Sequence, residues 1–336
     1  MSLTSIPRLR RVLAAFAAGI AAGAHAQSAA PVRATQPTAI VVLGAPGEST
    51  YEDTFTAQAA HWKDSAVRGG LRLISIGEEP VPSDGPDDLT RLKAAIAAEP
   101  QEGTEPLWLV LLGHGTFDGR AAKFNLRGPD LTATELALEL QPFKRPLVII
   151  NAASASAPFM NLLKGPDRII VTSTRSGYQQ NYARFGQFLA ETIGDLKGDL
   201  DKDGQTSLLE AYLSAAHQVA EFYKTEGRLA TEHALLDDNG DGRGTPADWF
   251  RGVRAVRRPA EGVALDGTRA HQVHLIPSPA ERALPAEVRL RRDEIEREIS
   301  DLREAKERML IDDYYRQLEE KFIELSRLYQ NAAQRT

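Results

Sequence analysis

Alternating apolar runs and helix-patterned segments constrain this chain more than any other feature of its sequence. Runs dominated by Val, Ile and Leu occupy residues 39–43, 71–75, 108–112, 147–151 and 169–172. Such nearly continuous hydrophobicity is typical of strands buried on both faces. Helix-patterned segments follow the strands at 51–67, 87–98, 132–140 and 181–196. This alternation predicts an α/β fold, a three-layer sandwich whose mostly parallel sheet is covered on both sides.

The N-terminal segment has the composition of an export signal. Residues 1–26 contain a cluster of arginines, an apolar run and an Ala-His-Ala cleavage motif, which together predict a signal peptide and a secreted, periplasmic protein. The apolar run is shorter than the roughly 20 residues that a membrane span needs, and no later segment is apolar enough to predict one. Residues 27–38 are mainly Ala, Ser, Pro and Thr and predict a flexible lead-in.

The charge and the absence of cysteine argue against a nucleic-acid-binding protein and against a fold held by disulfides or by thiolate metal sites. The net charge is −6, and removal of the arginine-bearing signal makes the chain more acidic, so nucleic acid is not an expected partner. The chain has no cysteine, which excludes disulfides and thiolate metal sites. An exported protein without disulfides needs another source of rigidity, and bound metal is one such source.

Residues 199–210 have the spacing of an EF-hand calcium loop. Loop positions 1, 3, 5, 7, 9 and 12 are Asp199, Asp201, Asp203, Gln205, Ser207 and Glu210. Gly204 permits the sharp turn at position 6, and Glu210 is placed to close the loop bidentately. Because Ca²⁺ takes six to eight oxygen ligands, this spacing predicts a Ca²⁺ site on an EF-hand-type insertion. The alternative is a solvated acidic turn, and Thr206 stands where EF-hands usually carry an aliphatic residue.

A second acidic loop covers residues 237–248. Its candidate ligands are Asp237, Asn239, Asp241, Arg243 and Asp248. The Asp, Asn, Asp, Gly order repeats that of the first loop, but position 12 is Asp instead of Glu, and a shorter carboxylate reaches the ion less readily. Two hypotheses remain open here, a second Ca²⁺ site and a helix capped by Thr245 and Pro246.

Two strand ends bring a histidine toward a serine. The strand at 108–112 leads into Gly113, His114 and Gly115, and the strand at 147–151 leads into a small-residue turn containing Ser154. If these parallel strands are neighbours, both turns open on one rim of the sheet. The pattern then predicts an imidazole beside a hydroxyl, as nucleophilic catalysis requires, with the amides of Gly115 and Ser154 facing a developing oxyanion.

A strand ending in His-Gly, followed about forty residues later by a strand ending in a small-residue nucleophile turn, resembles the legumain and caspase superfamily of cysteine peptidases. The resemblance runs from residue 39 to about 195, within a domain expected to end near residue 280. It implies a caspase-like sandwich in which His114 is the general base, Ser154 replaces the catalytic cysteine, and residues 172–178 help to line the primary specificity pocket. A peptide or protein ligand is the partner that this resemblance implies.

Because Ser154 stands where the family has its catalytic cysteine, the chain can be either an inactive or an active relative of these peptidases. A serine hydroxyl needs a base oriented by a third group, for which Asp118 is a candidate because it lies near His114 in sequence. The preferred hypothesis is a catalytically degenerate binding scaffold, and the alternative is an active Ser-dependent peptidase or hydrolase. An α/β-hydrolase-type esterase is a lesser alternative: the turn lacks the glycines of that motif, although histidines follow at His217, His233, His271 and His274.

The C-terminal part differs from the domain that precedes it. A strand is expected at 271–276, and residues 285–334 predict a long helix, a helical hairpin or a coiled coil. The apolar residues recur at three- and four-residue steps at Ile311, Tyr315, Leu318, Phe322, Leu325 and Tyr329. This stripe predicts either packing on the chain's own domain or a surface for a homodimer or another partner.

Overall fold

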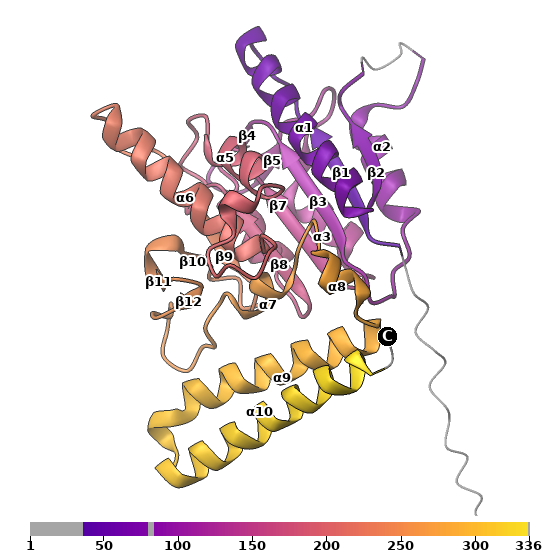
Figure 1. The fold of residues 1–336 in the computed structure, drawn as a ribbon. Coiled ribbons are helices and arrows are strands. Elements are labelled where there is room, and N and C mark those ends of the chain that lie inside the picture. Colours follow the sequence, from indigo (N-terminus) through magenta and orange to yellow (C-terminus); the bar gives the residue numbers. More distant parts are fainter. Residues whose placement is uncertain (1–35, 80–83, 335–336) are drawn as a thin grey trace, which may run out of the picture. The chain divides into compact units, whose positions relative to one another are not determined.

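A seven-stranded sheet forms the centre of the protein (Figure 1). The computed structural model describes residues 36–79 and 84–334, so the predicted signal peptide and most of the lead-in lie outside the described residues. The sheet has the order β10-β9-β8-β7-β3-β1-β2. Its strands are β1 (Thr38–Leu43), β2 (Arg72–Ile76), β3 (Leu107–Leu112), β7 (Leu147–Asn151), β8 (Arg168–Thr172), β9 (Leu235–Asp237) and β10 (Thr245–Pro246).

The first five strands of this sheet pair in parallel, whereas β9 and β10 are antiparallel to their neighbours. The mostly parallel α/β fold predicted from the apolar runs is therefore confirmed. Every residue of β1, β3 and β7 is buried. β2 is an edge strand paired only with β1, so Arg72 is exposed and the expected burial on both faces does not extend to it.

Helices cover both faces of the sheet, because alternate side chains of a strand point to opposite sides. Ala39, Val41 and Leu43 of β1 pack in the cluster that includes α1 (Ser49–Gly69), α5 (Phe185–Thr192) and α6 (Leu208–Thr225). Ile40 and Val42 pack in the opposite cluster, with residues of α2 (Asp88–Ala97), α3 (Ala133–Leu140) and α4 (Ala157–Leu163). This arrangement gives the three layers seen in Figure 1.

The helix in the segment 181–196 is shorter than expected, and its first residue is determined by a side chain that is distant in sequence. α5 begins at Phe185 because the carboxylate of Glu232 accepts hydrogen bonds from the amides of Arg184 and Phe185, both at 2.9 Å. Those amides belong to the N-terminal groups that a helix cannot satisfy internally. A short 3₁₀ turn, Leu196–Gly198, then leads into the first acidic loop.

The strand expected at 271–276 is wrong. The structure has a helix, α7 (Thr268–Gln272), and the segment after it makes only an isolated bridge between His274 and Ser207. The helix forms because the buried carboxylate of Asp238 accepts hydrogen bonds from the amides of Gly267 and Ala270, at 2.8 Å each. The alternation of apolar residues at 271–276 is therefore outweighed by a cap from Asp238, which lies about thirty positions earlier in the chain.

The remaining elements are small, apart from the C-terminal helices. They are the sheet of β4 (Gly115–Phe117), β5 (Ala122–Phe124) and β6 (Leu131–Thr132), the 3₁₀ helix η2 (Ala247–Trp249), the hairpin of β11 (Phe250–Arg251) and β12 (Arg254–Ala255), and α8 (Pro279–Ala283).

Residues near the C-terminus form a helical hairpin. α9 (Ala286–Ala305) and α10 (Ile311–Ala333) are joined by the 3₁₀ turn Lys306–Arg308 and are linked by an ion pair between Arg291 and Glu324. Of the predicted apolar stripe, Ile311, Tyr315, Phe322 and Tyr329 are exposed. None of the helices in the described ranges is long and apolar enough to cross a membrane.

Candidate functional site

The turns that follow β3 and β7 lie on one rim of the sheet, as predicted. The two strands are neighbours, with Leu111 paired to Asn151 at their ends. The turns also touch, since a Cβ on Gly115 would lie 2.3 Å from the carbonyl oxygen of Ser154. Residue 115 must therefore be glycine. Ala155, directly after the serine, has a left-handed backbone with a φ of 53°, a conformation that a non-glycine residue adopts at a cost.

The hydroxyl group of Ser154 is occupied by the backbone of Gly115. The amide of Gly115 donates to Ser154 Oγ, and Oγ donates to the carbonyl of Gly115, both at 3.1 Å. Ser154 is only 2 % exposed. Because the Gly115 amide already has an acceptor, it is not free to stabilise an oxyanion.

Strand geometry explains why Gly115 needs this partner. The amide of Asn125 donates to the carbonyl of His114, which makes Gly115 and Phe124 a non-hydrogen-bonded pair of the β4-β5 ladder. The amide and carbonyl of Gly115 consequently face away from β5, and β4 is an edge strand. Ser154 satisfies both groups at once, and buried backbone groups are rarely left unpaired.

The imidazole of His114 lies in an aromatic surround and does not contact the serine. Its ring centroid is 4.7 Å from that of Tyr51, 5.1 Å from Phe55 and 6.3 Å from Tyr182. Burial lowers the pKa of His114, opposed by a hydrogen bond to the carbonyl of Pro46 and the charge of Glu48. Burial also raises the pKa of Tyr182 to about 12, so its phenol is neutral.

No histidine in the described part of the chain hydrogen-bonds Ser154. Asp118 does not orient His114 either, because Asp118 Oδ1 accepts the turn amides of Arg120 and Ala121 at 2.8 Å each. The group at the imidazole is the carbonyl of Pro46. Pro46 follows β1, whose end lies on the same rim as those of β3 and β7, so strand order was the signal that identifies it.

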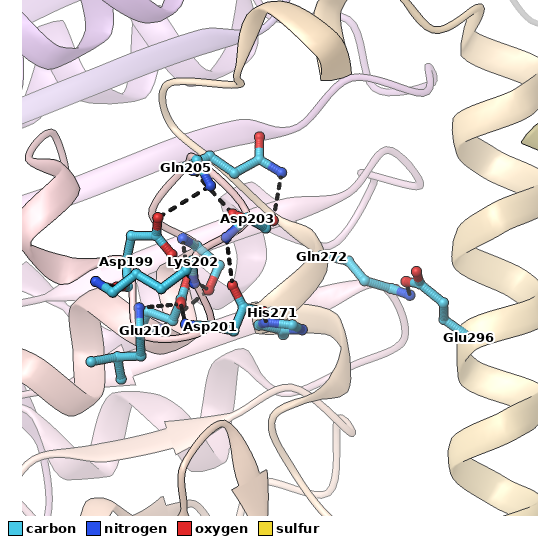
Figure 2. A network of polar contacts seen from close by, with 12 residues as sticks. Asp199, Asp201, Lys202, Asp203, Gln205, Glu210, His271, Gln272 and Glu296 are labelled. Carbon is cyan, nitrogen blue, oxygen red and sulfur yellow. Dashed lines mark hydrogen bonds and ion pairs between the residues drawn. The ribbon is translucent and has the colours of Figure 1, made fainter. Parts of the chain in front are cut away.

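The first acidic loop is folded around its own carboxylates (Figure 2). Asp199 accepts from the amides of Lys202 at 2.6 Å and Gly204 at 3.1 Å. Asp201 Oδ1 and Asp203 Oδ1 each accept from the amide two residues further on, at 3.2 Å and 3.0 Å. One oxygen from each of the three aspartates lies within 4.8 Å of the other two.

Glu210 closes this loop from the start of α6. It is 1 % exposed, and its Oε1 accepts from the amides of Leu200 at 2.7 Å and Asp201 at 3.2 Å. Its Oε2 accepts from the amide and the hydroxyl of Ser207, at 2.8 Å each. A histidine missed by the sequence pattern also reaches the loop, with His271 Nε2 at 3.0 Å from Asp201 Oδ2.

The donor set of the first loop fits a hard cation such as Ca²⁺. Carboxylate oxygens of Asp199, Asp201 and Asp203 lie close together, and Glu210 lies close to Asp201, so like charges so near one another favour a divalent ion between them. The side chain of Gln205 is engaged elsewhere, since Oε1 accepts from the Ser278 amide at 2.9 Å. Position 7 normally contributes its backbone carbonyl, so this does not weaken the fit.

The second acidic loop joins β9 to β10 and repeats the turn of the first. Asp237 accepts from the amides of Gly240 at 3.0 Å and Gly242 at 2.9 Å. Asn239 and Asp241 each accept from the amide two residues further on. Asp248 is exposed on η2 and makes no hydrogen bond to this loop in the described structure. Burial and the charges of Asp266 and Asp241 raise the pKa of Asp237 to about 6.

Comparison with known proteins gives similarity only at the level of solved structures. The Drosophila initiator caspase Dronc matches with a TM-score of 0.38 and 11 % identity, over 62 % of this chain and 80 % of that chain. Caspase-1 from Spodoptera frugiperda matches with a TM-score of 0.37 and 10 % identity, over 60 % and 86 %. No family model and no curated protein sequence matches. Both structures are caspases, and at these TM-scores and identities the similarity carries no argument.

Proposed function

We propose that this chain is a Ca²⁺-binding, caspase-like domain that binds a peptide or protein ligand without cleaving it. The observation that carries the proposal is the Ser154 hydroxyl, whose donor and acceptor capacities are both taken by Gly115. A nucleophilic serine must instead pass its proton to a base, and His114 makes no such hydrogen bond in the described structure. The same rim, with its aromatic surround of His114, remains a surface on which a peptide can lie.

Hydrolysis of a peptide-substrate library by the wild type and by Ser154→Ala tests the absence of catalysis. We expect no turnover above the buffer rate and no covalent labelling of the wild type by serine-directed probes. The alternative, an active Ser-dependent peptidase or hydrolase, predicts turnover that Ser154→Ala abolishes and that His114→Ala lowers as well. Turnover of that kind would overturn the scaffold proposal.

Calcium binding rests on the first loop. Its four carboxylates have the EF-hand order, and Glu210 already occupies the closing position with both of its oxygens bound to loop groups. An exported chain without cysteine gains from such an ion, because a ligand that binds only the folded state stabilises it. We expect Ca²⁺ to raise the melting temperature of the wild type. The triple variant carries Asp199→Ala and Glu210→Ala in the first loop and Asp237→Ala in the second. If Ca²⁺ raises its melting temperature as much as that of the wild type, Ca²⁺ binding is removed from the proposal.

The C-terminal hairpin is the second surface for a partner. Ile311, Tyr315, Phe322 and Tyr329 of α10 are each at least 40 % exposed, which leaves a large part of each apolar side chain open to solvent. A chain ending at residue 284 tests this surface by sedimentation equilibrium and by pull-down, next to the full chain. An unchanged mass and an unchanged set of captured proteins would exclude a role for residues 285–334 in association.

A further inference from the structure

The second acidic loop is the subject of an inference that goes beyond the first Ca²⁺ site. We infer that it forms a separate Ca²⁺ site whose closing carboxylate is Asp266, which lies outside the loop, and not Asp248 at its twelfth position. The inference shares its chemistry with the proposed function but involves none of the residues of the first loop. Its ligands come from two segments that are distant in sequence, which no continuous loop motif contains.

Asp266 makes the same contacts to the second loop that Glu210 makes to the first. Asp266 Oδ1 accepts from the amides at loop positions 2 and 3, Asp238 at 3.0 Å and Asn239 at 3.2 Å. Glu210 Oε1 likewise accepts from the amides at positions 2 and 3 of its loop, at 2.7 Å and 3.2 Å. The two carboxylates therefore occupy equivalent places.

The other oxygen of each closing carboxylate matches as well. Asp266 Oδ2 accepts from the hydroxyl of Thr245 at 2.6 Å, and Glu210 Oε2 accepts from the hydroxyl of Ser207 at 2.8 Å. Thr245 and Ser207 both stand at position 9 of their loops. Three of the four hydrogen bonds that Glu210 accepts in the first loop thus have a counterpart at Asp266, and the fourth, from the amide of Ser207, has none among the described residues.

The fold explains how a shorter side chain takes this place. Asp238 accepts from the amides of Gly267 and Ala270, which fixes the backbone directly after position 266 against the loop. Asp266 in turn binds the amide of Asp238, so the two segments hold each other. The side chain of an aspartate at position 12 of a continuous loop is too short to reach the ion well. Asp266 belongs to a different segment of the chain, whose backbone lies nearer to the loop.

A separate observation indicates that a cation belongs here. Asp237 is fully buried and Asp266 is 3 % exposed, and none of the ion pairs in the described residues involves either of them or Asp241. The Oδ2 atom of Asp241 is itself buried and accepts no hydrogen bond. Buried carboxylates are normally paired with a positive group or bound to a metal, because an isolated buried charge is strongly unfavourable. Among the described residues no ion pair supplies the compensating positive charge to these three carboxylates, and Lys164 Nζ reaches only the backbone carbonyl of Asp241, at 3.3 Å.

The donor chemistry selects the ion. Carboxylate oxygens of Asp237, Asp241 and Asp266, the amide oxygen of Asn239 and the backbone carbonyl of Arg243 are all hard ligands, and no sulfur or imidazole takes part. Such all-oxygen sets suit Ca²⁺ rather than zinc or copper. The ligand order Asp, Asn, Asp with glycine at position 6 is the one that EF-hand loops use.

Calorimetric titration of the full chain with Ca²⁺ counts the sites. We expect two ions per wild-type chain, one in Glu210→Gln, one in Asp266→Asn and none in the double variant. Asp248→Asn is the matched control and should retain two. Loss of one ion in Asp248→Asn, or two ions retained in Asp266→Asn, would overturn the inference.

The outcomes also separate this inference from the proposed function. One ion in the wild type that only Glu210→Gln abolishes leaves the first site standing and refutes the second, whereas one ion that only Asp266→Asn abolishes does the reverse. Circular dichroism checks that Asp266→Asn is folded. If it is not, Asp241→Asn in the Glu210→Gln background replaces it, and a Ca²⁺ affinity equal to that of Glu210→Gln alone contradicts the site.

Discussion

Replacing Ser154 by alanine should destabilise the protein, although the same change in a working nucleophile would not. The hydroxyl makes two hydrogen bonds of 3.1 Å to Gly115, and both groups of Gly115 face away from the β-ladder. Ser154 is only 2 % exposed, so the hydroxyl and the Gly115 groups that it binds lie away from solvent. Ser154→Ala therefore leaves a buried N–H and a buried C=O without partners.

The expected loss follows from those two groups. A buried polar group left unsatisfied costs about 1–3 kcal/mol, so the two groups of Gly115 should lower the free energy of unfolding of Ser154→Ala by about 2–6 kcal/mol. Ser173→Ala is a matched control, because Ser173 is another fully buried serine at a strand end whose Oγ has no hydrogen-bond partner. Removing a buried hydroxyl without partners should be neutral or stabilise the fold by roughly 1 kcal/mol.

Urea unfolding at a fixed, saturating Ca²⁺ concentration measures both variants. For a slope of about 3 kcal/mol per molar urea, the midpoint of Ser154→Ala should fall by roughly 0.7–2 M and that of Ser173→Ala should stay or rise. Active-site groups are commonly kept at the expense of stability, so a nucleophile predicts that Ser154→Ala is as stable as the wild type or more stable. That result would refute a structural role for Ser154 and favour the Ser-dependent hydrolase.

Three further predictions follow from the site. Glu210→Gln should reduce the gain in stability that Ca²⁺ gives the protein. For one site at a free Ca²⁺ concentration of 100 times Kd, that gain is about 2.7 kcal/mol. If thermal melts show the same gain for Glu210→Gln and for the wild type, the first site is contradicted. Gly115→Ala should unfold at lower urea than Ser154→Ala, because its Cβ would collide with the Ser154 carbonyl at 2.3 Å, and equal midpoints would argue against the close approach. His114 should titrate with a pKa below its usual 6.5 in NMR spectra, since burial disfavours the imidazolium. Its contribution to the stability of the fold is present above pH 6.5 and is lost as the pH falls toward the lowered pKa. A measured pKa of His114 at or above 6.5 contradicts this environment.

Much of the sheet was predictable because each central strand is a continuous apolar run that can be recognised from its own residues. β1, β3 and β7 are completely buried runs of apolar residues, and their order along the chain matches the parallel α/β arrangement. The turns after β3 and β7 were placed on one rim for the same reason. The start of α5 and the presence of α7 were not predictable, because both depend on carboxylates from other segments, Glu232 and Asp238. A local pattern contains no information about such caps.

The candidate site divides in the same way. His114, Ser154 and the acidic residues of the first loop were singled out by their spacing, but their roles depend on contacts that spacing does not encode. Proximity along the chain suggested Asp118 as the partner of His114, whereas the fold supplies the carbonyl of Pro46. Position 12 suggested Asp248 for the second loop, whereas Asp266 makes the closing contacts.

The sequence by itself determined what short stretches of chain decide alone: buried strands, a helical C-terminal part, and an acidic loop with glycine where the turn requires it. Such features depend on side-chain period and on local backbone conformation, which neighbouring residues set. Only the tertiary structure decided whether the Ser154 hydroxyl is free, since that depends on how closely two turns approach. It also decided which carboxylate accepts the amides at positions 2 and 3 of the second acidic loop, because α7 and its cap hold Asp266 beside that loop. Hydrogen bonds between distant segments depend on the packing of the whole domain, and no local spacing specifies them.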